Sequence, residues 1–126
     1  MECLVSKPLM TARRSDGIVI ADQVKTADSF GSRLIGLMGR RALEPGEALW
    51  FPGETSIHML FMRMPIDVRF LGAPDGQGSR VVVDLRRRLP AWRGVAWSRR
   101  AKGCLELEAG VLAERGVERG DRIILS

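Results

Sequence analysis

Short runs of alternating apolar and polar residues, separated by proline and glycine turns, fill most of the chain after residue 47. Such runs are typical of β-strands, because successive side chains of a strand point to opposite faces. The pattern predicts strands at 18–24, 48–51, 56–62, 66–71, 80–85, 92–97, 103–107 and 123–125. Many short strands at near-regular spacing predict a mainly β fold, a compact β-sandwich or barrel-like domain of mostly antiparallel strands. In the strand at 66–71 the alternation predicts that one face lies on a core.

Two short helices are expected beside the strands. Apolar residues recur at helical spacing between residues 29 and 41, which predicts an amphipathic helix there. A second helix of about two turns is predicted at 109–115, with Gly116 as its left-handed stop and Val117 in contact with Leu112. Asp121 is expected to accept backbone amides in the turn before the last strand.

Length and composition predict one globular domain. The chain has 126 residues, of which 45% are hydrophobic and 28% charged, so a disordered or fibrous protein is excluded. Residues 1–16 show no periodicity, so we expect them to form a flexible arm. We expect residues 17–126 to form a single β-rich domain. No apolar run approaches the length of a membrane span. The first residues lack the pattern of a secretory signal, and Cys3 and Cys104 make no disulfide framework, so we expect a cytoplasmic protein.

The positive charge of the chain is concentrated in one segment. Residues 80–104 hold eight cations against the single acid Asp84, whereas positive and negative groups balance in residues 1–79. A basic segment can attract phosphate or an anionic surface, which gives one hypothesis: anion or nucleic-acid association through residues 80–102. No helix-turn-helix or aromatic-rich motif accompanies the charge, so nucleic acid is the less favoured partner. The run 86–88 is interpreted as a solvated loop.

A small group of polar residues near Pro65 is the leading candidate site. His58 is the only histidine, and Arg63 and Asp67 flank the proline bend that follows it. A carboxylate can orient an imidazole while a guanidinium holds an anion, so these residues with Arg33 would form a concave ligand site. The alternatives are a structural histidine packed among apolar neighbours, and an enzyme in which His58 is a general base and Asp67 orients it.

Other chemistry has little support. One histidine and two distant cysteines leave no zinc or calcium ligand spacing, and no phosphate loop or nucleophile motif is present, so no metal and no cofactor are predicted. Three methionines and two phenylalanines are interpreted as core: Met59, Phe61, Met62, Met64 and Phe70. Trp92 and Trp97 are five residues apart, so on one strand one would be buried and the other partly exposed.

Three blocks of sequence together resemble a known family. They are 30–40 (FGSRLIGLMGR), 56–68 (SIHMLFMRMPIDV), and 105–110 (LELEAG) continuing to the Gly120-Asp121 turn. Their order and spacing resemble the family called domain of unknown function 192, found in bacteria and archaea. The resemblance covers nearly everything after residue 17 and implies a compact, mainly β domain with a small helix. It implies no particular activity. The chain departs from the family pattern at Arg69, where an apolar strand residue is usual, and at Glu108, where proline is common.

These observations favour a non-enzymatic β domain that binds a small polar or anionic ligand, or a partner protein, at the Pro65 bend. Arg33, His58, Arg63 and Asp67 are the predicted ligand-binding residues. An enzyme of unknown reaction and association through the basic segment are the alternatives. The oligomeric state and the ligand are not specified by the sequence.

Overall fold

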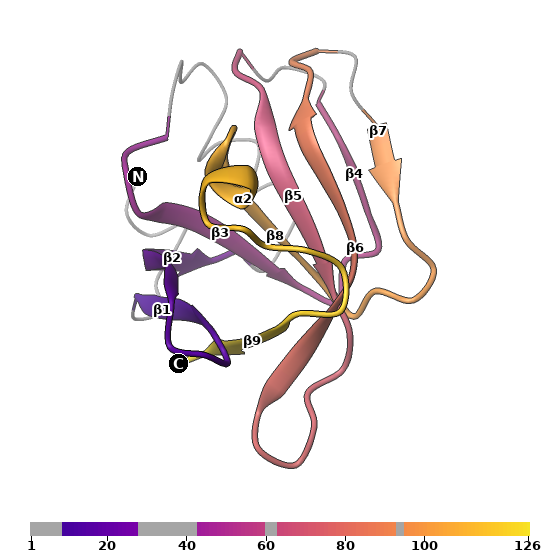
Figure 1. The fold of residues 1–126 in the computed structure, drawn as a ribbon. Coiled ribbons are helices and arrows are strands. Elements are labelled where there is room, and N and C mark those ends of the chain that lie inside the picture. Colours follow the sequence, from indigo (N-terminus) through magenta and orange to yellow (C-terminus); the bar gives the residue numbers. More distant parts are fainter. Residues whose placement is uncertain (1–8, 28–42, 60–62, 93–94) are drawn as a thin grey trace.

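Seven strands of this protein form a closed barrel. The computed structural model describes residues 9–27, 43–59, 63–92 and 95–126. Around the barrel the strands follow the order β1, β2, β3, β8, β5, β6 and β9 (Figure 1). Their bounds are Met10–Arg14 (β1), Val19–Thr26 (β2), Glu47–Pro52 (β3), Ile66–Leu71 (β5), Ser79–Leu89 (β6), Gly103–Glu108 (β8) and Arg122–Leu125 (β9). Only β2 and β3 pair in parallel. The mainly β prediction is confirmed, and the sheet closes into a barrel.

A second, two-stranded sheet lies outside the barrel. It consists of β4 (Ser56–His58) and β7 (Val95–Trp97), which pair antiparallel and which we call the β4–β7 ribbon. Figure 1 shows this ribbon beside β5 and β6, where Ile57 and Ala96 join a core cluster with Val68 and Phe70 of β5. The ribbon therefore covers the outer face of the barrel wall.

The protein has two apolar cores as a result. The inner core receives side chains from all seven barrel strands and from the short helix α2 (Val111–Glu114), including Leu71, Leu105, Leu112 and Ile123. The outer core lies between the barrel wall and the β4–β7 ribbon. β5 separates the two cores, and all six of its residues are buried. The expectation that only one face of this strand meets a core is therefore wrong, because the ribbon covers the second face.

The first segment of the chain also differs from expectation. Residues 10–14 were predicted to belong to a flexible arm, but they form β1, which pairs with both β2 and β9. Ala12 is fully buried in the inner core. The sequence pattern is weak here because only five residues are involved and two of them are arginines. Pairing on both sides supplies the stabilisation that local sequence does not.

The structure also differs from the sequence prediction at the arginine run 86–88 and at Trp92 and Trp97. Residues 86–88 belong to β6 and not to a loop. Trp92 and Trp97 are both exposed, with 52% and 62% of their surface accessible, so the prediction that one is buried is wrong. β7 includes only residues 95–97, so Trp92 does not share its alternation, and Ala96 is the residue that points into the outer core.

The C-terminal segment agrees with the sequence analysis. Gly116 has a φ of 67°, and the amide of Val117 donates to the carbonyl of Leu112 at 2.8 Å, which closes the helix. Asp121 accepts the amide of Glu118 at 2.9 Å, as predicted. The helix predicted between residues 29 and 41, like Phe61 and Met62, lies outside the described residues.

Candidate functional site

The structure describes only part of the predicted site at the Pro65 bend. Arg33 lies outside the described residues, and His58 is placed on β4 opposite Val95, with its side chain outside the description. Arg63 is exposed, whereas Asp67 is completely buried. Arg63 and Asp67 therefore do not share an accessible surface.

Asp67, on the inner face of β5, accepts backbone amides from β6 and from the start of helix α2. One carboxylate oxygen accepts the amide of Arg88 at 2.8 Å, and the other accepts the amides of Gly110 and Leu112 at 3.0 and 2.9 Å. Two of these amides begin helix α2, where unpaired N–H groups and the helix dipole favour a negative charge. Three backbone bonds give Asp67 a structural role, as the cap of a helix that is 43 residues away in sequence.

A second buried carboxylate lies on the outer face of the wall. Glu106 of β8 is fully buried and pairs with Val68 of β5 and Leu49 of β3, both of which belong to the outer core. Ile57 and Met59, the neighbours of His58, belong to the same core. Glu106 is thus a buried acid on the ribbon side of the sheet, whereas Asp67 faces the inner core.

Arg69 is the most unusual charged residue of the described chain. It is completely buried on β5, and its cross-strand partners are Leu105 and Leu85, both of which pack in the inner core. Directly paired residues point to the same side of a sheet, so the guanidinium extends into the barrel. Within the described part of the chain, none of its three nitrogens has a hydrogen-bond partner.

Burial changes the ionisation of this guanidinium without removing its charge. Desolvation lowers the pKa of Arg69 to about 9, and the negative charge of Asp121 acts in the opposite direction. Arg69 is therefore still a cation at neutral pH. A buried cation without hydrogen bonds is costly, and such groups in native proteins point to a functional role or to a bound water or ion.

An open pocket lies beside Leu85, the cross-strand partner of Arg69 on β6. It has a volume of about 320 Å³ and is lined by Leu85, Arg87, Glu118 and Arg119. Leu85 is the cross-strand partner of Arg69, and Glu118 is held by Asp121, which acts electrostatically on Arg69. β9 pairs with β6 along residues 79–81, and Val82 of β6 also bonds the backbone of Gly120 and Asp121 at 2.9 and 2.8 Å. The pocket lies further along β6, in the gap between Leu85 and Arg87 on one side and Glu118 and Arg119 of the turn after α2 on the other.

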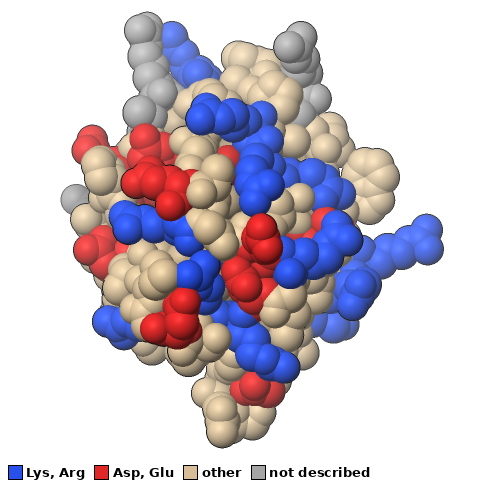
Figure 2. Space-filling model, viewed as in Figure 1, with Lys and Arg blue, Asp and Glu red and all other residues tan. Residues whose placement is uncertain are grey.

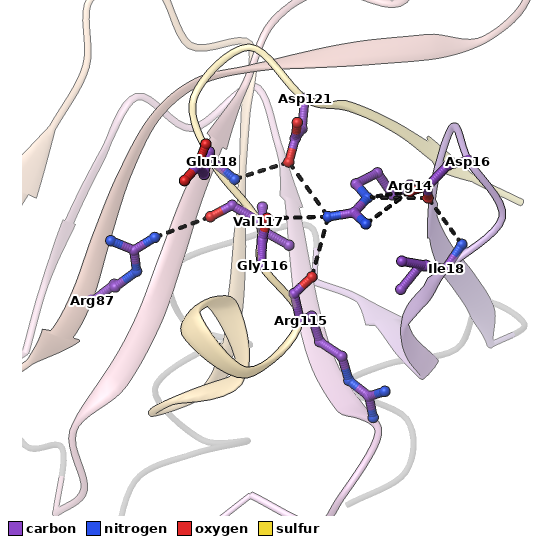
Figure 3. A network of polar contacts seen from close by, with 9 residues as sticks. All are labelled: Arg14, Asp16, Ile18, Arg87, Arg115, Gly116, Val117, Glu118 and Asp121. Carbon is purple, nitrogen blue, oxygen red and sulfur yellow. Dashed lines mark hydrogen bonds and ion pairs between the residues drawn. The ribbon is translucent and has the colours of Figure 1, made fainter.

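A network of polar contacts fixes the rim of this gap (Figure 3). Arg14 donates to the carbonyls of Arg115 and Gly116 at 3.2 and 3.1 Å and pairs with Asp16 at 2.8 Å. The same guanidinium lies 3.9 Å from Asp121. Its hydrogen bond lowers the pKa of the Asp16 carboxyl. The turn after α2 is therefore anchored to β1 across the end of the barrel.

Arg87 and Arg119 hold the other side of the pocket. Arg87 donates to the carbonyl of Val117 at 3.1 Å, and Arg119 pairs with Asp84 at 2.9 Å. Asp84 also pairs with Arg86 at 2.7 Å. Burial alone would raise the pKa of Asp84, but these two arginines lower it. Arg86 and Arg87 of the basic segment are thus committed to internal contacts, which weakens the interpretation of the whole segment as a nucleic-acid surface.

The described residues offer neither a metal-binding cluster nor a membrane-spanning helix. Among the described residues, no group of three or more histidine, cysteine or acidic side chains could hold a metal ion. No helix in the described part of the chain is long and apolar enough to cross a bilayer.

Comparison with known proteins gives the family. The model of the domain of unknown function 192 family, described as "Uncharacterized ACR", matches residues 11–125. The chain belongs to the domain of unknown function 192 family. It is 38% identical over 118 residues to the UPF0127 protein of Thermococcus sibiricus, which covers 90% of this chain and 73% of the relative. A UPF0127 protein of Pyrococcus furiosus is 40% identical over 113 residues, which covers 85% of this chain and 90% of the relative.

Two crystal structures share the fold. A Sinorhizobium meliloti protein with a proposed role as a transcription regulator superposes with a TM-score of 0.75 at 25% identity, over 92% of this chain and 91% of that chain. A Novosphingobium aromaticivorans protein of unknown function superposes with a TM-score of 0.69 at 20% identity, over 90% of this chain and 81% of that chain. The family predicted from the three sequence blocks is confirmed.

The sequence alone does not single out Arg69 as a candidate site residue, although a charged residue at an apolar strand position is a signal. Arg69 was noted only as a departure from the apolar residue that is usual at this position. A charged residue in an otherwise apolar strand position is a candidate functional residue once the strand is known to be buried on both faces. That second condition depends on tertiary structure.

Proposed function

We propose that this protein is a non-enzymatic binding domain for a small oxyanion, a carboxylate or a phosphate, and that Arg69 is its central ligand-binding residue. The supporting observation is the fully buried guanidinium whose three nitrogens have no hydrogen-bond partner in the described part of the chain. The proposal keeps the ligand class expected from the sequence and moves the site from the Pro65 bend to the end of the barrel.

The chemistry of the guanidinium favours an oxyanion over other ligands. Its planar fork of N–H donors matches the two oxygens of a carboxylate or phosphate, and it offers no acceptor. In a low-dielectric interior such a pair is much stronger than in water, provided that the remaining hydrogen-bonding groups are satisfied. An oxyanion would therefore relieve the cost of burying Arg69 and would gain a strong interaction in return.

The pocket at the gap supports an entry route for this ligand. Arg87 and Arg119 provide positive charge at the opening, and Leu85 provides an apolar wall next to Arg69. Glu118 adds one negative charge to the lining. This arrangement favours an anion of low charge, because a highly charged one would be repelled by Glu118 while only one buried cation is available to neutralise it.

The two sites considered from sequence have weaker support. An enzyme in which Asp67 orients His58 needs a free carboxylate, but both oxygens of Asp67 accept backbone amides. A ligand at the Pro65 bend that contacts both Arg63 and Asp67 would have to span an exposed and a fully buried position.

Thermal unfolding with added anions tests the proposal. We expect inorganic phosphate or acetate, added at constant ionic strength with chloride as reference, to raise the unfolding temperature of the native protein. A ligand at 100 times its dissociation constant adds about 2.7 kcal/mol to the free energy of unfolding. This stabilisation should disappear in R69M, weaken in R119Q at the pocket rim, and persist in the control R13M, which removes an exposed arginine of β1.

Two results would overturn the proposal. One is equal stabilisation of R69M and the native protein by the same anion, which would place the anion elsewhere. The other is the absence of any anion-specific stabilisation of the native protein across phosphate, acetate and sulfate. If R69M does not fold, R119Q still tests the proposal, because Arg119 is exposed and its substitution should not disturb folding.

A further inference from the structure

The β4–β7 ribbon, together with Trp92 shortly before β7, presents large apolar side chains to solvent. Trp92, Val95 and Trp97 have 52%, 59% and 62% of their surface accessible, and these three lie within six residues. Exposed tryptophans are uncommon on the surfaces of soluble domains, because each has a large apolar area. A contiguous apolar patch with a polar rim marks a site of interaction with a partner or a membrane.

The barrel holds this patch in a fixed position. Ile57 and Ala96 of the ribbon are buried in the outer core, so the alternate residues Val95 and Trp97 must point outward. The amide of Ser98 donates to the carbonyl of Thr55, and the amide of Trp92 donates to the carbonyl of Met59, both at 2.8 Å. The exposed side chains are therefore carried by a paired and anchored backbone.

Positive charge borders the patch on its C-terminal side. Arg99, Arg100 and Lys102 are exposed, and within the described ranges none of the three has an ion pair or hydrogen bond through its side chain. Residues 92–102 contain no acidic residue. Figure 2 shows the same asymmetry, because Lys and Arg predominate at the right-hand side of the view, where Figure 1 places β7, and acidic side chains gather toward the left and centre.

We propose that the β4–β7 ribbon binds the surface of an anionic lipid bilayer. Tryptophan is favoured at the boundary between headgroups and acyl chains, and unpaired cations are attracted to anionic headgroups. Val95 favours a bilayer over a single-stranded nucleic acid, because an aliphatic side chain inserts among acyl chains but cannot stack on bases. No ribbon residue lines the pocket beside Leu85, so this inference does not depend on the proposed function.

Vesicle binding tests this proposal with the full chain. We expect it to co-sediment with vesicles of phosphatidylglycerol and phosphatidylcholine, and to bind pure phosphatidylcholine vesicles at least about tenfold more weakly. Tryptophan emission should shift to shorter wavelength on binding, because Trp92 and Trp97 leave water while Trp50 is already buried.

Matched variants separate the ribbon from the rest of the surface. V95S/W97A should weaken binding to anionic vesicles about tenfold or more. R99Q/R100Q should weaken it about fivefold for each charge removed. The control I18A/V19A removes the exposed apolar pair at the start of β2 and should leave binding unchanged.

Other results would reject the bilayer as partner. Binding to anionic vesicles that V95S/W97A does not weaken would show that the patch is not the contact surface. Binding of a single-stranded oligonucleotide, lost in V95S/W97A and without any binding to vesicles, would assign the patch to nucleic acid. No binding to anionic vesicles at low salt by the folded native protein would also overturn the proposal.

Discussion

Arg69 carries its charge inside the barrel at neutral pH, because burial lowers the pKa of its guanidinium only to about 9. The protein thus keeps a strong anion-binding group in a place where an apolar residue would pack at lower cost. Functional residues in folded proteins often have this property, since a group poised for a ligand is not fully satisfied without it. In contrast, Asp67 lies two residues earlier on the same face and is fully satisfied by three backbone amides.

The stability of the ligand-free protein should depend on the ionisation of Arg69. The folded protein releases the proton of Arg69 near pH 9, whereas the solvated guanidinium of the unfolded chain keeps its proton to a much higher pH. The unfolded state binds more protons in this window, so the free energy of unfolding should increase as pH rises through it. Below pH 9 the cost of the buried charge is fully present.

Urea unfolding of native protein and R69M between pH 7 and 10.5 measures this effect. R69M should be more stable than the native protein by about 1–4 kcal/mol at pH 7, because an apolar side chain replaces a buried charge. The difference should shrink as pH approaches 10.5. If the difference is constant across this range, or if R69M is the less stable protein at pH 7, Arg69 is not a destabilising buried cation.

At the scale of the elements, helix α2 depends on a residue of β5. α2 has only four residues and Gly110 as its N-cap, which provides no side-chain hydrogen bond. Asp67 supplies the missing acceptors from 43 and 45 residues away. The same helix leads, after Arg115 and Gly116, into the turn whose Glu118 and Arg119 line the pocket, so this contact also helps to position one side of the pocket.

Substitution of Asp67 tests this dependence. D67N should lower the free energy of unfolding by about 3 kcal/mol, because the amide cannot accept all three N–H groups and buried donors lose their partners. Urea denaturation gives the value, and E54Q is a control at an exposed acid for which a change within about 0.5 kcal/mol is expected. A loss below 1 kcal/mol in D67N would mean that the three bonds contribute little.

The strands were largely predictable from sequence, but their environments were not. Alternation and turn residues predict the bounds 66–71 of β5 and the left-handed stop of α2 at Gly116. Alternation cannot show that Arg69 is buried, because its face of β5 is covered by strands and a helix that come from distant parts of the chain. For the same reason the sequence placed the candidate site at the Pro65 bend, where polar residues are close in sequence.

At the scale of the whole molecule, closure of the barrel requires the C-terminal strand. β9 pairs with β1 on one side and with β6 on the other. Thr11 and Ser126 exchange two backbone hydrogen bonds, at 2.8 and 3.1 Å. The pocket lies beyond the last backbone hydrogen bonds that join β6 to Gly120 and Asp121, so the position of the segment leading into β9 also sets the shape of the candidate site.

Two neighbouring isoleucines of β9 test this closure. Ile123 is fully buried in the inner core, whereas Ile124 is only partly buried. I123A should lower the free energy of unfolding by about 2–5 kcal/mol, and I124A by clearly less, because only the first leaves a cavity inside the barrel. Equal losses in the two variants, measured by urea denaturation, would contradict the register of β9 in this barrel.

The guanidinium of Arg69 can be observed directly by nuclear magnetic resonance. The ¹⁵Nε signal of Arg69, assigned as the arginine signal that is missing in R69M, should shift progressively and saturate as inorganic phosphate or acetate is added at constant ionic strength. Movement of this signal at a single saturable site, larger than that of any other arginine, is the result that oxyanion binding predicts. An Arg69 signal that stays in place while the signals of surface arginines move would contradict it.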